Sequence, residues 1–531
     1  MNDGFRRLIV CTGNLFNAIK YLCELLRPIN ENEHEQWIEK VIEAIQKLPL
    51  SSPIIDEEVV KKAVENVSSS EIEDIKTLLR VINIFEVPKW QFSLERKKFV
   101  LDSADRCLHG EADDKALYTI VYQRTVNHEL FRPSLPGTSI SNSDNYGLVK
   151  IEYLLGLNCK QNNVIVLGHL TQLVEGEYHL EDDTGEVKAS LSQAKFHTGL
   201  FTQNCFVLVE GWFEDGILHA NTIGLPPAED PTTTRALVGN VNYFGGPGST
   251  CAKYNHHLEE LEQSNAGAMI VIISDLWLDK IQVMEKLKIL FEGYAFCPPL
   301  AFIFCGNFLS SSHGSSQVSD LKSLFSGLAD LILKVPELSV SKFIFVPGPS
   351  DPGPGNIYPR PPLPTFITED FSQRLPNSEF TTNPCRLLYC TQEIVIFRED
   401  IFTKMCRNSI YFPADASNIA NHFARTIVCE AHLSSLPLHT VPVYWALDHC
   451  LAIHPTPDVI VTADRGDPFT AKYNSATIFN PREILFLLIG KGFRITFRRN
   501  RHFYQCCEAY IETSTSSISD FDCSNNFLSG G

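Results

Sequence analysis

Apolar side chains in the first 85 residues recur every three or four positions, which is the period of an amphipathic helix. One series precedes Pro49, another follows Pro53, and a third follows Ser70 and Glu73, which form a capping-box pattern. The three series are Trp37, Ile38, Val41, Ile42, Ile45 and Leu48; Val59, Val60, Ala63, Val64 and Val67; and Ile72, Ile75, Leu78, Leu79 and Ile82. The spacing predicts a small helical bundle over residues 1–85.

Residues 86–145 contain a basic stretch and one helix-like segment near Leu117–His128, and they end in a run of Pro, Gly, Ser and Asn, which indicates a loose connector with partial order. Over residues 146–228 the pattern changes to short alternating strands separated by polar turns. The expected strands are Val164–Leu167, Tyr178–Glu181, Val187–Leu191, Phe206–Val209 and Ile217–Ile223. Five short strands with such turns are typical of a Greek-key barrel.

Three apolar runs in the second half of the chain each break into polar, Gly or Pro residues. They are Val271–Asp279, Phe302–Asn307 and Phe343–Asp351. This is the pattern of buried strands whose carboxyl ends open into loops, and α/β folds place ligands at that rim. Residues 251–480 are therefore expected to form an α/β domain. The Gly-rich segment within residues 229–250 lacks the ending of a phosphate loop and is expected to be a flexible linker.

The three strand ends resemble those of the calcineurin-like metallophosphoesterases, which read D-x-H, G-D-x-x-D and G-N-H-D. The resemblance implies a two-metal site in which one carboxylate bridges two dications. Asp275 keeps the first carboxylate, but Trp277 stands where the first His is expected. Asn307 replaces the bridging Asp, so a neutral amide would face two doubly charged ions.

The third strand end is altered as well. Pro349 replaces the metal-binding Asn, and Ser350 replaces the His that protonates the leaving group, whereas Asp351 is retained. Further along, His432 matches the lone His of these enzymes. Their final G-H-x-H motif falls on Ala463, Asp464, Arg465 and Gly466. The resemblance thus implies a degenerate site, with no catalytic residue, cofactor or metal ligand assigned.

A residual metal-dependent phosphoesterase or exonuclease is the alternative. It would have to use the acids and the imidazole that remain at the strand ends. These are Asp275, Asp279, Asp351, His432 and Asp464.

Several longer peptides resemble the non-catalytic second (B) subunits of DNA polymerase epsilon, within the DNA polymerase B-subunit family. They are Gly211–Gly216, Ser274–Asp279, Phe380–Cys385 with Tyr389–Glu393, and Pro442–Ala446. The resemblance implies a multidomain α+β protein. Its parts would be an N-terminal domain similar to the helical lid of AAA+ ATPases, an OB-fold in residues 146–228 and an inactive calcineurin-like phosphoesterase sandwich in residues 251–480.

The same resemblance implies the partners of the chain. Its OB-fold and phosphoesterase-like units would hold the zinc-bearing C-terminal domain of the polymerase's catalytic subunit. The N-terminal domain would reach the GINS complex of the replicative helicase, and the small histone-fold subunits of the holoenzyme would be reached indirectly. The chain would then be a nuclear scaffold for chromosomal replication without turnover of its own.

Charge bears on contact with DNA. Among 531 residues, 63 Asp and Glu against 45 Lys and Arg leave a net charge of -18, which disfavours attraction to phosphates. Between Val164 and Gly224 the basic residues are Lys188 and Lys195, and nine acids oppose them. An OB-fold that binds single strands needs a basic groove. We therefore expect DNA to be bound weakly or through the complex.

The 16 cysteines are scattered without a C-x-x-C pattern, which indicates a reduced compartment, and Cys385 and Cys390 are expected to be buried thiols. No membrane span is expected, because the apolar run Ile484–Ile489 is far shorter than the roughly 20 residues that cross a bilayer. The tail, residues 481–531, departs from the family. Its basic stretch Arg494–Arg501 either contacts DNA or serves as a nuclear signal, or the tail is an ending that never packs.

Overall fold

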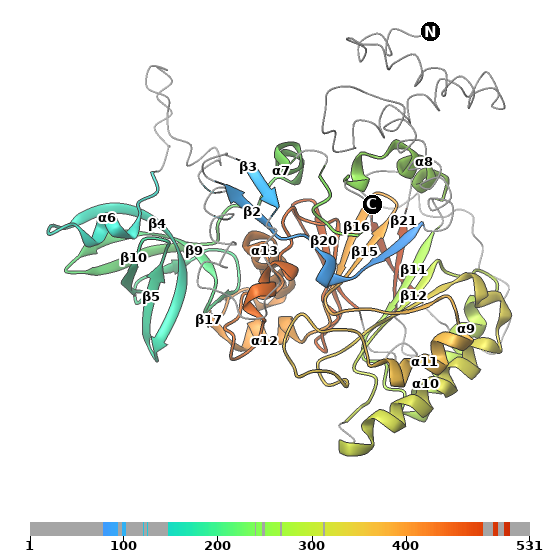
Figure 1. Cartoon of the computed structure of the whole chain (residues 1–531). Helices are drawn as coiled ribbons and strands as arrows, with labels where there is room; N and C mark the ends of the chain where they lie inside the picture. The colour runs from blue at the N-terminus through green and yellow to red at the C-terminus, as the bar shows by residue number, and fades with distance from the viewer. Residues whose placement is uncertain are drawn as a thin grey trace, which may run out of the picture.

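The computed structural model describes residues 78–93, 98–101, 121, 125, 147–238, 241–246, 250–265, 268–311, 314–481, 492–497 and 504–509. The predicted N-terminal bundle lies outside the described residues, apart from its last few. Figure 1 shows a barrel joined through two helices, α12 (Ile401–Arg407) and α13 (Ile419–Glu430), to a larger body that contains two sheets. None of the described helices has the length and apolarity needed to span a membrane.

The barrel has the strand order β6-β5-β4-β9-β10-β7 and is closed by a parallel pairing of β10 with β6. Its strands are β4 (Gln161–Val174), β5 (Glu177–Glu181), β6 (Glu186–Ser190), β7 (Lys195–Phe196), β9 (Phe206–Glu214) and β10 (Ile217–Gly224). At Gly211 the neighbouring strand comes so close that a Cβ would lie 1.9 Å from the carbonyl oxygen of His219. The five predicted strands and the barrel are confirmed.

Two six-stranded sheets form the larger body of the described chain. The first sheet has the order β14-β13-β12-β11-β21-β22, with β11 (Met269–Ile273), β12 (Ala301–Cys305), β13 (Lys342–Val346), β14 (Ser378–Phe380), β21 (Gly492–Phe497) and β22 (Tyr504–Ala509). The second has the order β1-β15-β16-β18-β20-β19, with β1 (Leu79–Ile82), β15 (Cys385–Tyr389), β16 (Gln392–Ile396), β18 (Val459–Val461), β19 (Phe469–Tyr473) and β20 (Ala476–Asn480).

Alternation along the strands creates a layered body, because successive side chains of a strand point to opposite faces. Ile270, Ile303 and Ile344 of the first sheet belong to a core shared with strands β15, β16 and β18 of the second. Val271 and Phe302, on the opposite face, pack on the helices α9 (Ile281–Tyr294), α10 (Gln317–Leu333) and α11 (Thr365–Arg374). The outer face of the second sheet packs on α12 and α13, so the sheets lie between two helical layers.

Helix α13 also holds the barrel. Three side chains spaced four residues apart, and therefore on one face of the helix, accept hydrogen bonds from backbone amides of the barrel segment. The bonds run from Gly199 N to His422 Nδ1 at 3.0 Å, from Leu200 N to Thr426 Oγ1 at 2.8 Å and from Phe206 N to Glu430 Oε2 at 2.9 Å. The strands β8 (Phe201–Thr202) and β17 (Ser409–Tyr411) pair beside this contact.

The structure corrects one prediction about the connections and adds an element to another connection. Residues 79–82 were predicted to continue a helix, but they form β1, which pairs with β15. The linker between barrel and sheets contains a helix that was not predicted, whereas the expected flexibility of its Gly-rich segment stays a prediction. This helix is α7 (Pro231–Val238), whose Arg235 lies 3.0 Å from the carboxylate of Glu393, and Tyr243 of the linker is buried in the core.

The tail also differs from one of its predicted alternatives. An ending that never packs is wrong for residues 492–497, because β21 pairs antiparallel with β11 and β22 pairs with β21. Arg494 therefore belongs to a sheet strand, opposite Val271. Tertiary pairing with a buried strand decides the structure of this segment.

Candidate functional site at the carboxyl ends of the strands

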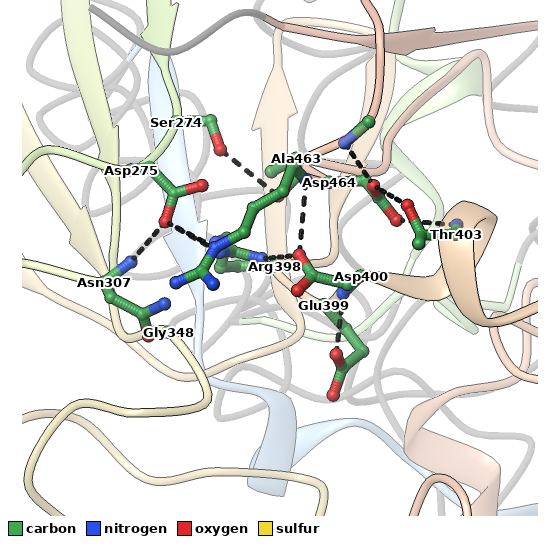
Figure 2. A network of polar contacts seen from close by, with 12 residues as sticks. Ser274, Asp275, Asn307, Gly348, Arg398, Glu399, Asp400, Thr403, Ala463 and Asp464 are labelled. Atoms are coloured by element: carbon green, nitrogen blue, oxygen red, sulfur yellow. Dashed lines mark hydrogen bonds and ion pairs between the residues drawn. The ribbon is translucent and has the colours of Figure 1, made fainter. Parts of the chain in front are cut away.

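Asp275, Asn307 and Asp351 follow β11, β12 and β13, which are adjacent parallel strands. Their carboxyl ends meet at one edge of the sheet, as predicted. The backbone amide of Asn307 donates to Asp275 Oδ1 at 3.2 Å, and Asn307 Oδ1 accepts from the amide of Ser350 at 2.8 Å. Figure 2 shows the Asp275 carboxylate next to the backbone amide of Asn307. The three predicted strand ends therefore form one cluster.

A cation from the second sheet enters this cluster. Arg398 lies just beyond the end of β16, and its side chain is fully buried. Its guanidinium donates to Asp275 Oδ1 at 2.8 Å, to Asp400 Oδ1 at 2.9 Å and to the carbonyl oxygen of Gly306. Figure 2 shows the side chain reaching between the two carboxylates. Arg398 thereby joins the strand ends of both sheets.

Neighbouring carboxylates stabilise the charged form of Arg398. Burial opposes its charge, but the carboxylates of Asp275 and Asp400 raise its pKa above the ordinary arginine value. The same contact lowers the pKa of Asp400, although burial acts in the opposite direction. A second cation stands close by, since Arg465 Nε lies 3.7 Å from Asp275 Oδ1. One oxygen of Asp275 thus faces two guanidinium groups.

Asp351 is buried, and backbone amides use both of its oxygens. Oδ1 accepts from Phe308 N at 2.8 Å, and Oδ2 accepts from Gly348 N at 2.7 Å. Burial raises the pKa of Asp351 to about 6, and the two amide bonds partly offset this rise. The fit is close, because a Cβ on Gly306 would lie 1.9 Å from Asp351 Oδ2. The carboxylate therefore fixes the loops of the strand ends.

The carboxylate of Asp464 is also used inside the protein. It accepts from the hydroxyl of Thr403 at 2.8 Å and from its backbone amide at 3.2 Å, in the first turn of α12. Gly466 N donates to the same carboxylate at 2.5 Å. Burial raises the pKa of Asp464, and these hydrogen bonds oppose the rise. Asp464 therefore secures the start of a helix.

The structure does not bring His432 into the cluster by any described contact. Its Nδ1 lies 2.8 Å from the carbonyl oxygen of Ser434, and its Nε2 lies 3.3 Å from Asp448 Oδ1. Burial disfavours the charged ring, but Asp448 and the neighbouring hydrogen bonds give a net rise of its pKa. His432 is thus committed to the loop that follows α13.

The other predicted positions belong to the same loops. The backbone amide of Trp277 donates to the carbonyl oxygen of Asp275 at 3.0 Å, and its ring packs against the core beneath the outer helices. The carbonyl oxygen of Pro349 accepts from Arg360 Nη1 at 2.5 Å, and that of Ser350 accepts from Gln317 at 3.0 Å. Asp279 accepts from Ser310 N at 2.9 Å. Among the described residues, no three His, Cys, Asp or Glu side chains are grouped to hold a metal ion.

Arg398, Asp400 and Arg360 were not predicted from the sequence. Arg360 is buried and donates to the backbone carbonyls of Pro349 and Asp351, so it braces the loop after β13. A signal for Arg398 was present, because the apolar run Ile394–Phe397 breaks into Arg-Glu-Asp in the same way as the other strand ends. That break could have placed a charged cluster at the edge of the second sheet.

Comparison with known proteins decides the family. DNA polymerase epsilon subunit 2 of Homo sapiens is 48% identical over 495 residues, which cover 91% of this chain and 94% of the human one. The chain belongs to the DNA polymerase epsilon subunit 2 family. The subunit 2 of Drosophila melanogaster is 36% identical over 472 residues, covering 87% of this chain and 89% of the fly protein. The subunit 2 of Caenorhabditis elegans, named as probable, is 30% identical over 536 residues, covering 99% and 97%.

Family models extend this assignment along the chain. Residues 270–471 match the model of the B subunits of DNA polymerases alpha and epsilon, and residues 115–227 match the OB-fold domain of DNA polymerase epsilon subunit 2-like proteins. Residues 16–67 match the N-terminal model of DNA polymerases epsilon. The match over the barrel confirms the predicted OB-fold. The family resemblance drawn from the sequence is confirmed as well.

Proposed function

We propose that this chain is a non-catalytic accessory subunit of DNA polymerase epsilon, acting as a scaffold in chromosomal replication in the nucleus. Membership of the subunit 2 family supports the assignment to the polymerase. One observation carries the absence of turnover: the Arg398 guanidinium is seated on Asp275, the first ligand position of a calcineurin-like site. The strand ends are then a degenerate phosphoesterase site that has become a structural joint.

Electrostatics supports this interpretation of the strand ends. A dication placed beside Asp275 would stand within a few Å of Arg398, whose charge its carboxylate partners secure. At about 4 Å and an effective dielectric constant near 20, each pair of unit charges interacts by about 4 kcal/mol, so repulsion by Arg398 of about 8 kcal/mol would cancel the attraction of a dication to Asp275. The neutral side chain of Asn307 supplies no charge that would add to the attraction.

Metal content and hydrolysis test the proposal together. Purified protein dialysed against Mn²⁺ should hold far less than two metal ions per chain, and it should hydrolyse a generic phosphodiester no faster than the buffer. Activity that co-elutes with the protein and disappears in Asp275→Ala would establish the residual phosphoesterase instead.

We place the docking site for the C-terminal domain of the catalytic subunit on the surface where the barrel meets α13. Tyr411 and Phe412 are exposed beside the β8–β17 pairing, and the Tyr411 ring stacks on Phe196 of the barrel at 4.7 Å. Leu438 is exposed in a loop that the barrel contacts through Asn204. Exposed aromatic and aliphatic side chains of this kind are typical anchors of a protein interface.

A pair of substitutions tests that docking site. Phe412→Asp should weaken retention of the catalytic subunit's C-terminal domain in a pull-down at least about tenfold, since central interface aromatics contribute about 2 kcal/mol or more. Phe366→Asp is the matched control, because Phe366 is a similarly exposed aromatic on α11, in the helical layer of the first sheet. Equal binding by both variants would show that the docking site lies elsewhere on the protein.

We further propose that residues 1–77 link the polymerase to the GINS complex of the helicase, and that the small histone-fold subunits associate through the catalytic subunit. The family match over residues 16–67 supports a dedicated domain there. Deleting residues 1–77 keeps β1, so the shortened chain should lose GINS while it retains the polymerase. Retention of GINS by the shortened chain would refute this assignment.

A further inference from the structure

Residues 78–87, which we call the strap, cross the edge of the second sheet before the chain reaches the barrel. The strap consists of β1 and the short helix η2 (Ile84–Glu86). Antiparallel pairing places Leu79 opposite Tyr389 and Ile82 opposite Arg386. In the sequence, the barrel therefore lies between the strap and the other strands of the second sheet.

Side chains and backbone of the strap are both engaged by the body. Its buried side chains are Leu79, Ile82, Ile84 and Val87, of which Leu79 lies in the core between the sheets and the other three in the core under α13. Cys390 N donates to the carbonyl oxygen of Leu78 at 3.0 Å, and Ile84 N donates to Thr382 Oγ1 at 3.2 Å. An edge strand with this much buried apolar surface belongs to the core and does not behave as a removable addition.

The strap also contacts the linker by which the chain leaves the barrel. A Cβ on Gly245 would lie 3.1 Å from Val87 and 3.2 Å from Ile82, and Gly245 has a φ of +100°. Arg386, opposite Ile82 on β15, donates to the carbonyl oxygen of Phe244 at 3.1 Å. The chain segments on either side of the barrel are thus packed together on the second sheet.

We propose that the strap is a fixed anchor for the N-terminal region. It sets, on the second sheet, the point from which residues 1–77 leave the body. This inference rests on the proposed function, in which the N-terminal region engages the helicase. A partner held there would be positioned relative to the two sheets, whereas a loose tether would let its distance vary as in a random coil.

Hydrogen exchange of the full-length chain tests the anchor. Ile84→Asp places a charge in the core under α13, and the strap should detach, so amides of β15 should exchange at least about tenfold faster while those of β4 and β9 stay protected. Glu86→Gln is the matched control, because Glu86 is exposed on the same short helix. Should Ile84→Asp unfold the body, Ile84→Ala should still give a smaller change confined to β15. Unchanged β15 exchange in both Ile84 variants would overturn the proposal.

Small-angle X-ray scattering then tests positioning. Detachment of the strap should increase the largest dimension of the full-length chain, and Glu86→Gln should leave it unchanged. If β15 exchanges faster but the largest dimension of the chain does not change, the strap does not position the N-terminal region. Failure of the wild-type chain to bind GINS would refute the proposed helicase link. Hydrogen exchange and scattering of the isolated chain would still show whether the strap is a fixed anchor.

Discussion

Arg398 donates a hydrogen bond to Asp275 Oδ1 at 2.8 Å, and neither side chain is exposed to solvent. The two residues come from different sheets, so the pair fastens the sheets together at the edge where their strands end. A buried pair of this kind is costly to break, because removal of one partner leaves the other charge unpaired in a medium of low polarity.

Arg398→Met should therefore destabilise the protein by about 3–5 kcal/mol, measured as the free energy of unfolding in urea. The double variant Arg398→Met with Asp275→Leu should recover much of that loss, because it leaves no buried charge at the pair. A double variant as unstable as the single one would show that the carboxylate is held mainly by other groups.

Asp351 should give the stability a pH dependence. Its folded pKa of about 6 lies above the ordinary aspartate value of about 3.9, so the folded protein binds this proton more tightly than the unfolded chain. The associated stabilisation is present below about pH 4 and is lost as the pH rises through about 6, a change of up to about 3 kcal/mol. The measurement is urea unfolding of wild type and Asp351→Asn at several pH values.

The stability advantage of wild type over Asp351→Asn should shrink as the pH rises from 4 to 7. The Asn variant should still be destabilised at pH 4. Its NH₂ group cannot accept a hydrogen bond and would face one of the two backbone N–H donors, those of Phe308 and Gly348. A difference that does not change with pH would mean that Asp351 titrates normally in the folded protein.

Gly211→Ala should destabilise the barrel, because the new Cβ would meet the carbonyl oxygen of His219 at 1.9 Å. The expected loss in the free energy of unfolding is at least about 1–3 kcal/mol, with larger shifts of the backbone raising it. Gly293→Ala is the control, since its Cβ meets no atom within 4 Å and Gly293 lies inside α9. There alanine should stabilise by about 0.5–1 kcal/mol. Differential scanning calorimetry separates the two outcomes.

Ending the chain after residue 481 should expose the edge of β11, which β21 covers along Met269–Ile272. A buried, apolar strand with an open edge is an aggregation site, so the truncated protein should lose solubility and should bind thioflavin T on warming. Truncation at residue 510 keeps both β21 and β22 and is the control. Equal solubility of the two truncated chains would show that this pairing contributes little.

Elements with a local pattern could be predicted from the amino-acid sequence alone. Alternating side chains between Val164 and Gly224 gave the barrel strands, because the two faces of a barrel strand differ in polarity. The apolar runs at Val271, Phe302 and Phe343 gave three adjacent strands, and their polar ends placed Asp275 and Asn307 at one edge. Each of these signals lies within about ten residues, so no distant contact was needed to interpret it.

Features that depend on distant partners could not be predicted without the folded structure. The segment Leu79–Ile82 fits a helical and an extended pattern equally, and pairing with β15 about 300 residues later selects the strand. Arg398 is 123 residues from Asp275, and its local sequence carries no sign of the carboxylate that it meets. Burial removes water as the competing partner for both charges, and that desolvation, which only the folded chain creates, makes the two side chains a single structural unit.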